Sequence, residues 1–95
     1  NEVNMHSVQL SKDNDGSLRA LMLIRNGAQQ ALTFEKLPLA LHDATGDIAA
    51  KGLFEIGSLT VNPQTSKPWL FIFPPESMIK QDPDLTSWKM SVIQQ

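Results

Sequence analysis

Apolar and polar residues alternate along most of this chain with a period of two, which is the period of a β-strand because successive side chains point to opposite faces. The segment 17–25 shows the pattern clearly, with Leu18, Ala20, Met22 and Ile24 on one face. Segments rich in glycine, proline, asparagine and aspartate interrupt the alternation, as turns do. Long amphipathic helix patterns are missing, so the sequence predicts an all-β protein.

The alternating segments are short, and turn signals separate them by about 8–12 residues, which is typical of a β-sandwich. We expect one domain over residues 1–95, built as a two-sheet sandwich of seven or eight antiparallel strands with an immunoglobulin-like Greek key. A small β-barrel is the alternative. A helical turn is predicted at Glu76–Lys80, with Pro75 at the first helical position. The predicted strands begin at Val8 and then span 17–25, 31–34, 37–43, 48–55, 59–61, 67–73 and 88–93.

Aromatic residues mark the predicted core. Trp69, Phe71 and Phe73 occupy alternate positions, so one face of their strand should pack inside the sandwich. Trp88 begins a similar alternation near the end of the chain, and we expect both Trp side chains to be buried. Pro38 lacks a backbone N–H and should therefore lie at a strand start or on a sheet edge.

Two predicted strands break the alternation, because their second face is also apolar. Leu21 and Leu23 lie opposite the Met22 face, and Leu70 and Ile72 lie opposite the Trp69 face. Either the segment 74–87 folds over these side chains, which is the favoured interpretation, or they form an apolar patch for a partner or a neighbouring domain. The four residues are the candidate interaction face.

Composition excludes several classes of function. Eight basic and ten acidic residues give a net charge of −2, so neither a nucleic-acid surface nor attraction to anionic lipid is expected. The chain has no cysteine, which rules out disulfides and thiol chemistry and favours a reducing compartment. The longest apolar runs, Ala20–Ile24 and Trp69–Pro75, are far shorter than the roughly 18 residues of a membrane helix.

Candidate catalytic residues are few. His6 and His42 are the only histidines, and His42 adjoins Asp43. Neighbours on a strand point to opposite faces, so this His and Asp should diverge rather than act as an acid–base pair. No Gly-x-Ser-x-Gly nucleophile motif is present, although a Ser-His-Asp site built from distant residues remains an alternative. We expect no enzyme activity.

One segment resembles the start of a calcium-binding loop. Asp13-Asn14-Asp15-Gly16 supplies oxygen ligands at alternate positions, but an EF-hand loop ends with a glutamate at its twelfth residue. The twelfth residue from Asp13 is Ile24, so the segment is interpreted as a polar hairpin turn. No metal and no cofactor are expected.

Five stretches together resemble a known family. In chain order they are Leu23–Gly27, Leu37–Leu41, Ala50–Phe54, Ser66–Pro74 and Asp84–Trp88. Over about residues 6–92 the chain is similar to the SLAP domain of the accessory Sec system S-layer assembly proteins of Gram-positive bacteria. The most specific parts are Lys67-Pro68-Trp69 with Phe73-Pro74, and the closing Leu85 to Trp88.

The resemblance implies a non-catalytic module that works beside an accessory translocation ATPase in the export of surface-layer proteins. It also implies one copy from a longer protein in which the domain can occur twice. We therefore expect a protein partner, either the S-layer precursor or the accessory ATPase, with a neighbouring copy of the domain as a further contact. The expected location is the cytoplasm or the cytoplasmic face of the membrane. The alternatives are an extracellular domain that binds cell wall or spaces other domains, and a small hydrolase.

Overall fold

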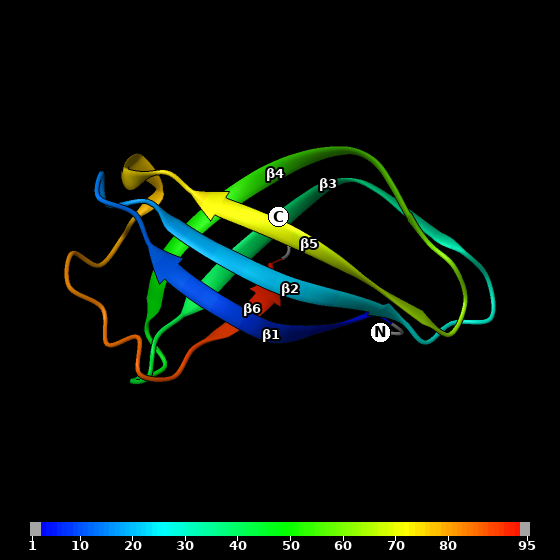
Figure 1. The fold of residues 1–95 in the computed structure, drawn as a ribbon, viewed down its shortest axis with the longest axis horizontal. Helices are drawn as coiled ribbons and strands as arrows, with labels where there is room; N and C mark the ends of the chain where they lie inside the picture. Colours follow the sequence, from blue (N-terminus) through cyan, green and yellow to red (C-terminus); the bar gives the residue numbers. More distant parts are fainter. Residues whose placement is uncertain (1–2, 94–95) are drawn as a thin grey trace.

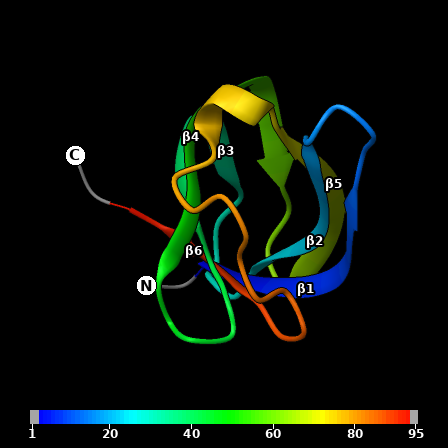
Figure 2. The same cartoon turned by 90° about the vertical axis from the view of Figure 1, so that its left-hand side faces the viewer.

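Two three-stranded antiparallel sheets face each other in the computed structural model, which describes residues 3–93 (Figures 1 and 2). The first sheet has the strand order β1-β2-β5 and the second has the order β4-β3-β6. One 3₁₀ turn, η1 (Pro75–Ser77), begins at Pro75 as predicted but ends at Ser77, three residues before the predicted end at Lys80. The strands are β1 (Val3–Lys12), β2 (Leu18–Asn26), β3 (Leu32–His42), β4 (Ile48–Val61), β5 (Thr65–Phe73) and β6 (Lys89–Val92).

The predicted all-β sandwich is confirmed, but the described residues form six strands rather than seven or eight. Two pairs of predicted strands are continuous. The segments 31–34 and 37–43 join in β3 through a register shift between Phe34 and Lys36, and 48–55 and 59–61 join in β4. A β-bulge adds a residue without ending the strand, which interrupts the alternation that sequence patterns rely on.

No hydrogen-bonded ladder joins the two sheets within residues 3–93, so the alternative of a closed barrel is wrong. The immunoglobulin-like Greek key and the assignment of residues 1–95 to one domain stay predictions.

The core lies between the two sheets. The face of β2 predicted to be internal is buried, and Phe71 and Phe73 of β5 are buried against it. The Phe54 ring of β4 meets both in edge-to-face contacts, with centroid distances of 5.1 and 5.0 Å. This geometry is favourable for aromatic rings. The buried cluster comprises Leu18, Ala20, Met22, Ile24, Leu37, Leu39, Leu41, Ala49, Ala50, Leu59, Val61, Phe71, Phe73 and Met90.

The prediction that Trp69 and Trp88 are buried overstates their burial. Both pack against the core but are only half-buried. Trp88 also lies one residue before β6 rather than inside it. An indole is too large to be enclosed fully in so small a sandwich, and full burial of Trp is uncommon in general.

Pro38 lies within β3, at the point where the pairing with β6 ends. Its carbonyl accepts a hydrogen bond from the Ile93 amide at 2.9 Å, so its absent N–H also faces the β6 side rather than β4. The ladder between β3 and β4 therefore loses no donor at Pro38. Pro38 thus lies inside the central strand of its sheet, so the prediction of a strand start or a sheet edge is wrong. The missing N–H is tolerated because the pairing with β6 ends at this residue.

The Asn26-Gly27 turn does not close a hairpin. It carries the chain from β2 in one sheet to β3 in the other. The buried Asn26 amide donates to the carbonyls of Gln30 and Val61 at 2.8 and 2.9 Å, and its oxygen accepts from the Ala28 amide at 2.8 Å. Asn26 thereby joins three separate pieces of backbone at this end of the sandwich.

The segment between β5 and β6 crosses the opposite end of the sandwich, as the orange path in Figure 2 shows. Met78 bridges to Ala50, and the amide of Ile79 donates to the carbonyl of Ala49 at 2.8 Å. Met78 and Leu85 pack against the core. Among the described residues, no helix has the length and apolar character needed to cross a membrane.

Candidate interaction surface

The outer face of the β1-β2-β5 sheet carries the four candidate residues. Leu21 of β2 lies directly across from Leu70 of β5, and Leu23 lies across from Pro68. Leu21 and Leu23 are half-buried, whereas Leu70 is 43% exposed and Ile72 is 42% exposed. The structure therefore brings the four residues onto one surface, which we call the outer apolar face.

The favoured interpretation, that segment 74–87 covers these side chains, is wrong. That segment pairs with Ala49 and Ala50 at the end of the second sheet, because Met78 and Leu85 find apolar contacts there. Leu70 and Ile72 stay open to solvent. The broken alternation in the sequence thus reflects an uncovered surface.

Val8, on β1 of the same sheet, is a further exposed apolar residue that the sequence pattern did not single out. The alternation places Val8 and Leu10 on one side of a strand that begins at Val8. In the structure β1 begins at Val3 and has a register shift between Ser7 and Gln9. Val8 is consequently 52% exposed while Leu10 packs against the core. No signal in the sequence marks this bulge.

Polar side chains border the outer apolar face. Gln9, Ser11 and Arg19 line a shallow depression of about 150 Å³ together with Leu21 and Leu70. The Arg19 guanidinium is not free, because its Nε lies 2.9 Å from an Asp13 carboxylate oxygen. An apolar centre with a polar border is the usual anatomy of a protein contact surface.

A buried carboxylate organises the end of the sandwich that segment 74–87 crosses. The Asp43 side chain has no exposed surface and lies 2.7 Å from the Lys80 ammonium, which also lies 3.0 Å from Asp47. One Asp43 oxygen accepts from the Thr45 hydroxyl at 2.7 Å. The Lys80 hydrogen bond, followed by the one from Thr45, holds the pKa of Asp43 well below its ordinary value of 3.8. The hydrogen bonds to Asp43 and then to Asp47 raise the pKa of Lys80. The cluster ties the β3–β4 loop to segment 74–87.

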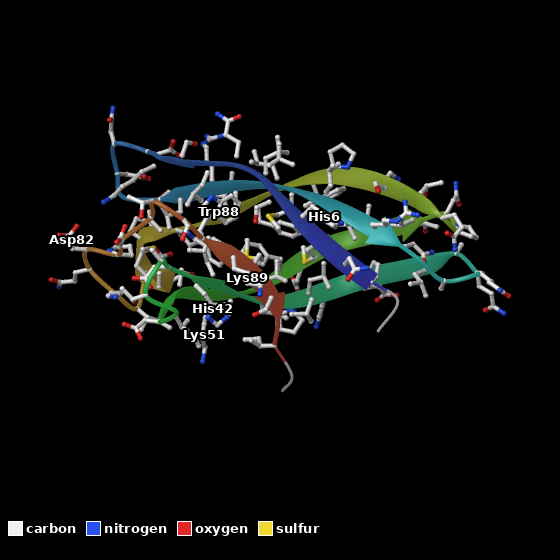
Figure 3. All side chains as sticks on the ribbon, turned by 90° about the horizontal axis from the view of Figure 1, so that it is seen from below. His6, His42, Lys51, Asp82, Trp88 and Lys89 are labelled. Carbon is white, nitrogen blue, oxygen red and sulfur yellow. The ribbon has the colours of Figure 1, made fainter. Side chains whose placement is uncertain are left out.

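A histidine and a serine meet on the outer side of the second sheet. His42 Nε2 lies 3.0 Å from the Ser91 hydroxyl, and Nδ1 lies 3.4 Å from the Gly46 carbonyl. Asp43 turns away from the imidazole toward Lys80, as the opposite faces of neighbouring strand residues predict. The pair borders an open depression of about 710 Å³ that Trp88 also lines (Figure 3). Within the described residues no Ser-His-Asp triad is assembled here.

The calcium-like segment forms the β1–β2 hairpin turn. The Gly16 amide donates to the Asp13 carbonyl at 3.0 Å, and the Asp15 carboxylate accepts from the Ser17 amide at 2.9 Å. Gly16 has a φ of +95°, a conformation that favours glycine. Residues 3–93 contain no group of three or more histidines or carboxylates placed to hold a metal ion.

Fold and surface together define a small β-sandwich with an uncovered apolar face and a polar border. The chain belongs to the SLAP domain family, because the family model described as "SLAP domain" matches residues 1–94. The stretches that resemble this family in the sequence lie within the matched range.

No curated protein matches the chain. A solved structure, described as "X-ray structure of Northeast Structural Genomics Consortium target SoR45", is similar to it at 18% sequence identity. The similarity covers 98% of this chain and 80% of that one, with a TM-score of 0.45.

Proposed function

We propose that this domain is a non-catalytic protein-interaction module that assists accessory Sec-dependent export and assembly of surface-layer proteins. The observation that carries the proposal is the outer apolar face, on which Leu70 and Ile72 are each more than two-fifths exposed. Membership of the SLAP domain family supports the export context. The partner is the S-layer precursor or the accessory translocation ATPase, and the domain acts in the cytoplasm or at the cytoplasmic face of the membrane.

The physical argument rests on how the exposed side chains are grouped. Scattered exposed leucines are normal, but adjacent ones on one face mark a surface that another protein covers. Leu21 and Leu70 are cross-strand neighbours, and Ile72 follows on the same face of β5. A surface of this modest size forms weak contacts that release quickly, which suits a factor that holds a client only during export.

The experiment that tests the proposal compares two matched variants in a pull-down with purified S-layer precursor and purified accessory ATPase. Leu70→Asp places a charge on the outer apolar face. Leu53→Asp makes the same change at a 51% exposed leucine of β4, on the other sheet. We expect Leu70→Asp to weaken capture at least tenfold and Leu53→Asp to leave it within about twofold. Circular dichroism and thermal melts check that both variants fold.

Capture of neither partner by the wild-type domain, together with binding to purified cell wall, would replace the export proposal by the wall-binding alternative. Equal losses in both variants would remove the outer apolar face from the proposal. A saturable esterase activity lost on Ser91→Ala would instead support the hydrolase alternative, because Ser91 is the hydroxyl in contact with His42.

A further inference from the structure

The outer face of the β4-β3-β6 sheet carries two exposed lysines from different strands. Lys51 of β4 lies across from Ala40 of β3, and Lys89 of β6 lies across from His42 of β3. Leu41, between Ala40 and His42 in the chain, is buried in the core. Since neighbouring strand residues point to opposite faces, Ala40, His42 and the lysines beside them face outward, as the labels in Figure 3 show for the three polar residues.

The charges of these two lysines are not balanced by nearby carboxylates. Within the part of the chain that the structure describes, no ion pair includes Lys51 or Lys89. Glu55, further along the same face of β4, lies 3.8 Å from Lys36. The two carboxylates of the adjoining β3–β4 loop both bind Lys80. The sheet surface around the two lysines therefore has a positive charge, although the chain as a whole is acidic.

An exposed apolar side chain lies next to these cations. Leu53 is two residues from Lys51 on the same face of β4, and it is 51% exposed. It lies across from Pro38 of β3, which is half-buried. We call the surface formed by Lys51, Leu53 and Lys89 the cationic face. It lies on the opposite side of the sandwich from the outer apolar face, because the two surfaces belong to different sheets.

We propose that the cationic face attaches the domain to a membrane surface that contains anionic phospholipids. Lys51 and Lys89 lie among the lipid phosphate groups, and Leu53 enters the boundary between headgroups and acyl chains without spanning the membrane. The inference rests on the proposed function, since it selects the cytoplasmic face of the membrane as the place where the outer apolar face holds its client. Both faces can be occupied at once because they point in opposite directions.

The residue types of the cationic face favour a lipid surface over the other anionic partners. Its cations are lysines, which act as point charges on flexible stems, whereas arginine provides the bidentate geometry for a fixed phosphate or carboxylate. Lysine is also depleted in protein–protein interfaces. The Ser91 hydroxyl, which could complete a specific phosphate site, is already 3.0 Å from His42 Nε2. Mobile cations beside an exposed leucine instead match the charged and apolar layers of a membrane surface.

The net charge of −2 is compatible with this attachment. Charges further than about 8 Å from a membrane are largely screened at physiological ionic strength. Two packed sheets lie roughly 10 Å apart, so a membrane on one side of the sandwich interacts mainly with the near sheet. The expectation of no attraction to anionic lipid considers only the total charge. Each lysine near an anionic surface strengthens binding about fivefold, so attachment through two lysines is weak and reversible.

The test is co-sedimentation of the domain with phosphatidylglycerol vesicles at millimolar lipid and low salt, compared with phosphatidylcholine vesicles. We expect binding to phosphatidylglycerol alone. Replacing both Lys51 and Lys89 by Gln should weaken it about thirtyfold, as expected from a roughly fivefold effect of each lysine. Replacing both Lys12 and Lys67 by Gln is the matched control, because it removes the same charge from exposed positions of the first sheet. The control should change binding less than about twofold.

Two further variants separate this inference from the proposed function. Leu53→Asp should weaken vesicle binding at least fivefold, whereas Leu70→Asp should leave it within about twofold. Client capture should respond in the opposite way, so either idea can fail alone. Thermal melts check that all variants fold.

Four results overturn the inference. They are no binding at millimolar phosphatidylglycerol, equal binding to both lipids, equal losses in the two double lysine variants, and a loss of vesicle binding in Leu70→Asp but not in Leu53→Asp. The last result would assign the membrane contact to the outer apolar face. Client capture that is lost only in Leu70→Asp, without any vesicle binding, would leave the proposed function standing.

Discussion

At the scale of single residues, Asp43 reinforces a connection that the backbone also makes, through the hydrogen bond from the Ala44 amide to the Asp84 carbonyl at 2.8 Å. Its two carboxylate oxygens accept from the amides of Thr45, Asp47 and Asp84 in addition to the Lys80 ammonium and the Thr45 hydroxyl. Five donors satisfy this buried charge, and a buried charge is tolerated only when it is satisfied in this way. These contacts add to the backbone hydrogen bond that attaches segment 74–87 to the β3–β4 loop.

We predict that Asp43→Asn lowers the stability of the domain near pH 7 and that its effect shrinks in acid. The pKa of Asp43 in the folded domain is lowered below 3.8, so its contribution is complete above the ordinary value and is lost as the pH falls toward the folded value. Urea unfolding from pH 7 to pH 2.5 measures this difference. The exposed Asp82→Asn variant is the control. If the difference in unfolding free energy between Asp43→Asn and the unmodified domain stayed constant from pH 7 to pH 2.5, the lowered pKa of Asp43 would be contradicted.

Asn26 has a comparable role at the other end of the sandwich. Its side chain is 1% exposed and satisfies two carbonyls and one amide. We predict that Asn26→Ala costs at least the ~1–3 kcal/mol of an unsatisfied buried polar group. Gln29→Ala, at an exposed position of the same connection, should cost under about 0.5 kcal/mol. Denaturant unfolding of both variants measures these costs. Equal free energies of unfolding for the two variants would refute the predicted role of Asn26.

At the scale of elements, the sequence predicts the faces of the strands better than their limits. The alternation in 17–25 correctly identifies the buried face of β2, because every inward residue there is apolar. It fails at Val8 and near Glu35, since a bulge shifts the phase of the pattern without changing the residue types. The outer apolar face could be found from Leu21, Leu23, Leu70 and Ile72.

The open edge of β6 could not be predicted in the same way. Whether a strand is central or at an edge depends on pairing between residues far apart in the chain, and no local pattern encodes that pairing. Val92 has the residue type of a core position, and only the position of β6 beside β3 shows that it is half-exposed. The same holds for His42 and Ser91, whose contact depends on that pairing.

Packing between strands leads to a prediction at Gly52 of β4. A Cβ atom at this position would lie 3.3 Å from the Phe54 ring and 3.7 Å from Phe73. Both rings are held in edge-to-face contact, so they have little room to move. Gly52→Val should therefore destabilise the domain by about 1–3 kcal/mol. Lys51→Val, at the exposed neighbouring position, should change stability by under about 0.5 kcal/mol in the same denaturant titration.

At the scale of the whole molecule, acidic residues gather at one end of the sandwich. The β1–β2 turn, the β3–β4 turn and segment 74–87 meet there, at the left of Figure 1. Seven of the ten acidic residues of the chain belong to these three connections: Asp13, Asp15, Asp43, Asp47, Glu76, Asp82 and Asp84. So many carboxylates at one end suggest a cation site. Several of these carboxylates, however, already have partners within the protein, which argues against such a site.

We predict that calcium and zinc do not stabilise the domain. Asp13 is engaged by Arg19, and Lys80 lies between Asp43 and Asp47. The Asp15 carboxylate accepts from the Ser17 amide, and the Asp84 carboxylate accepts from Thr86. A metal ion would have to replace these contacts. Thermal melts in EDTA and then in millimolar CaCl₂ or micromolar ZnCl₂ should therefore coincide within about one degree. A ligand of the native state raises the melting temperature by mass action, so a saturable rise abolished by Asp15→Asn would establish a metal site at this end.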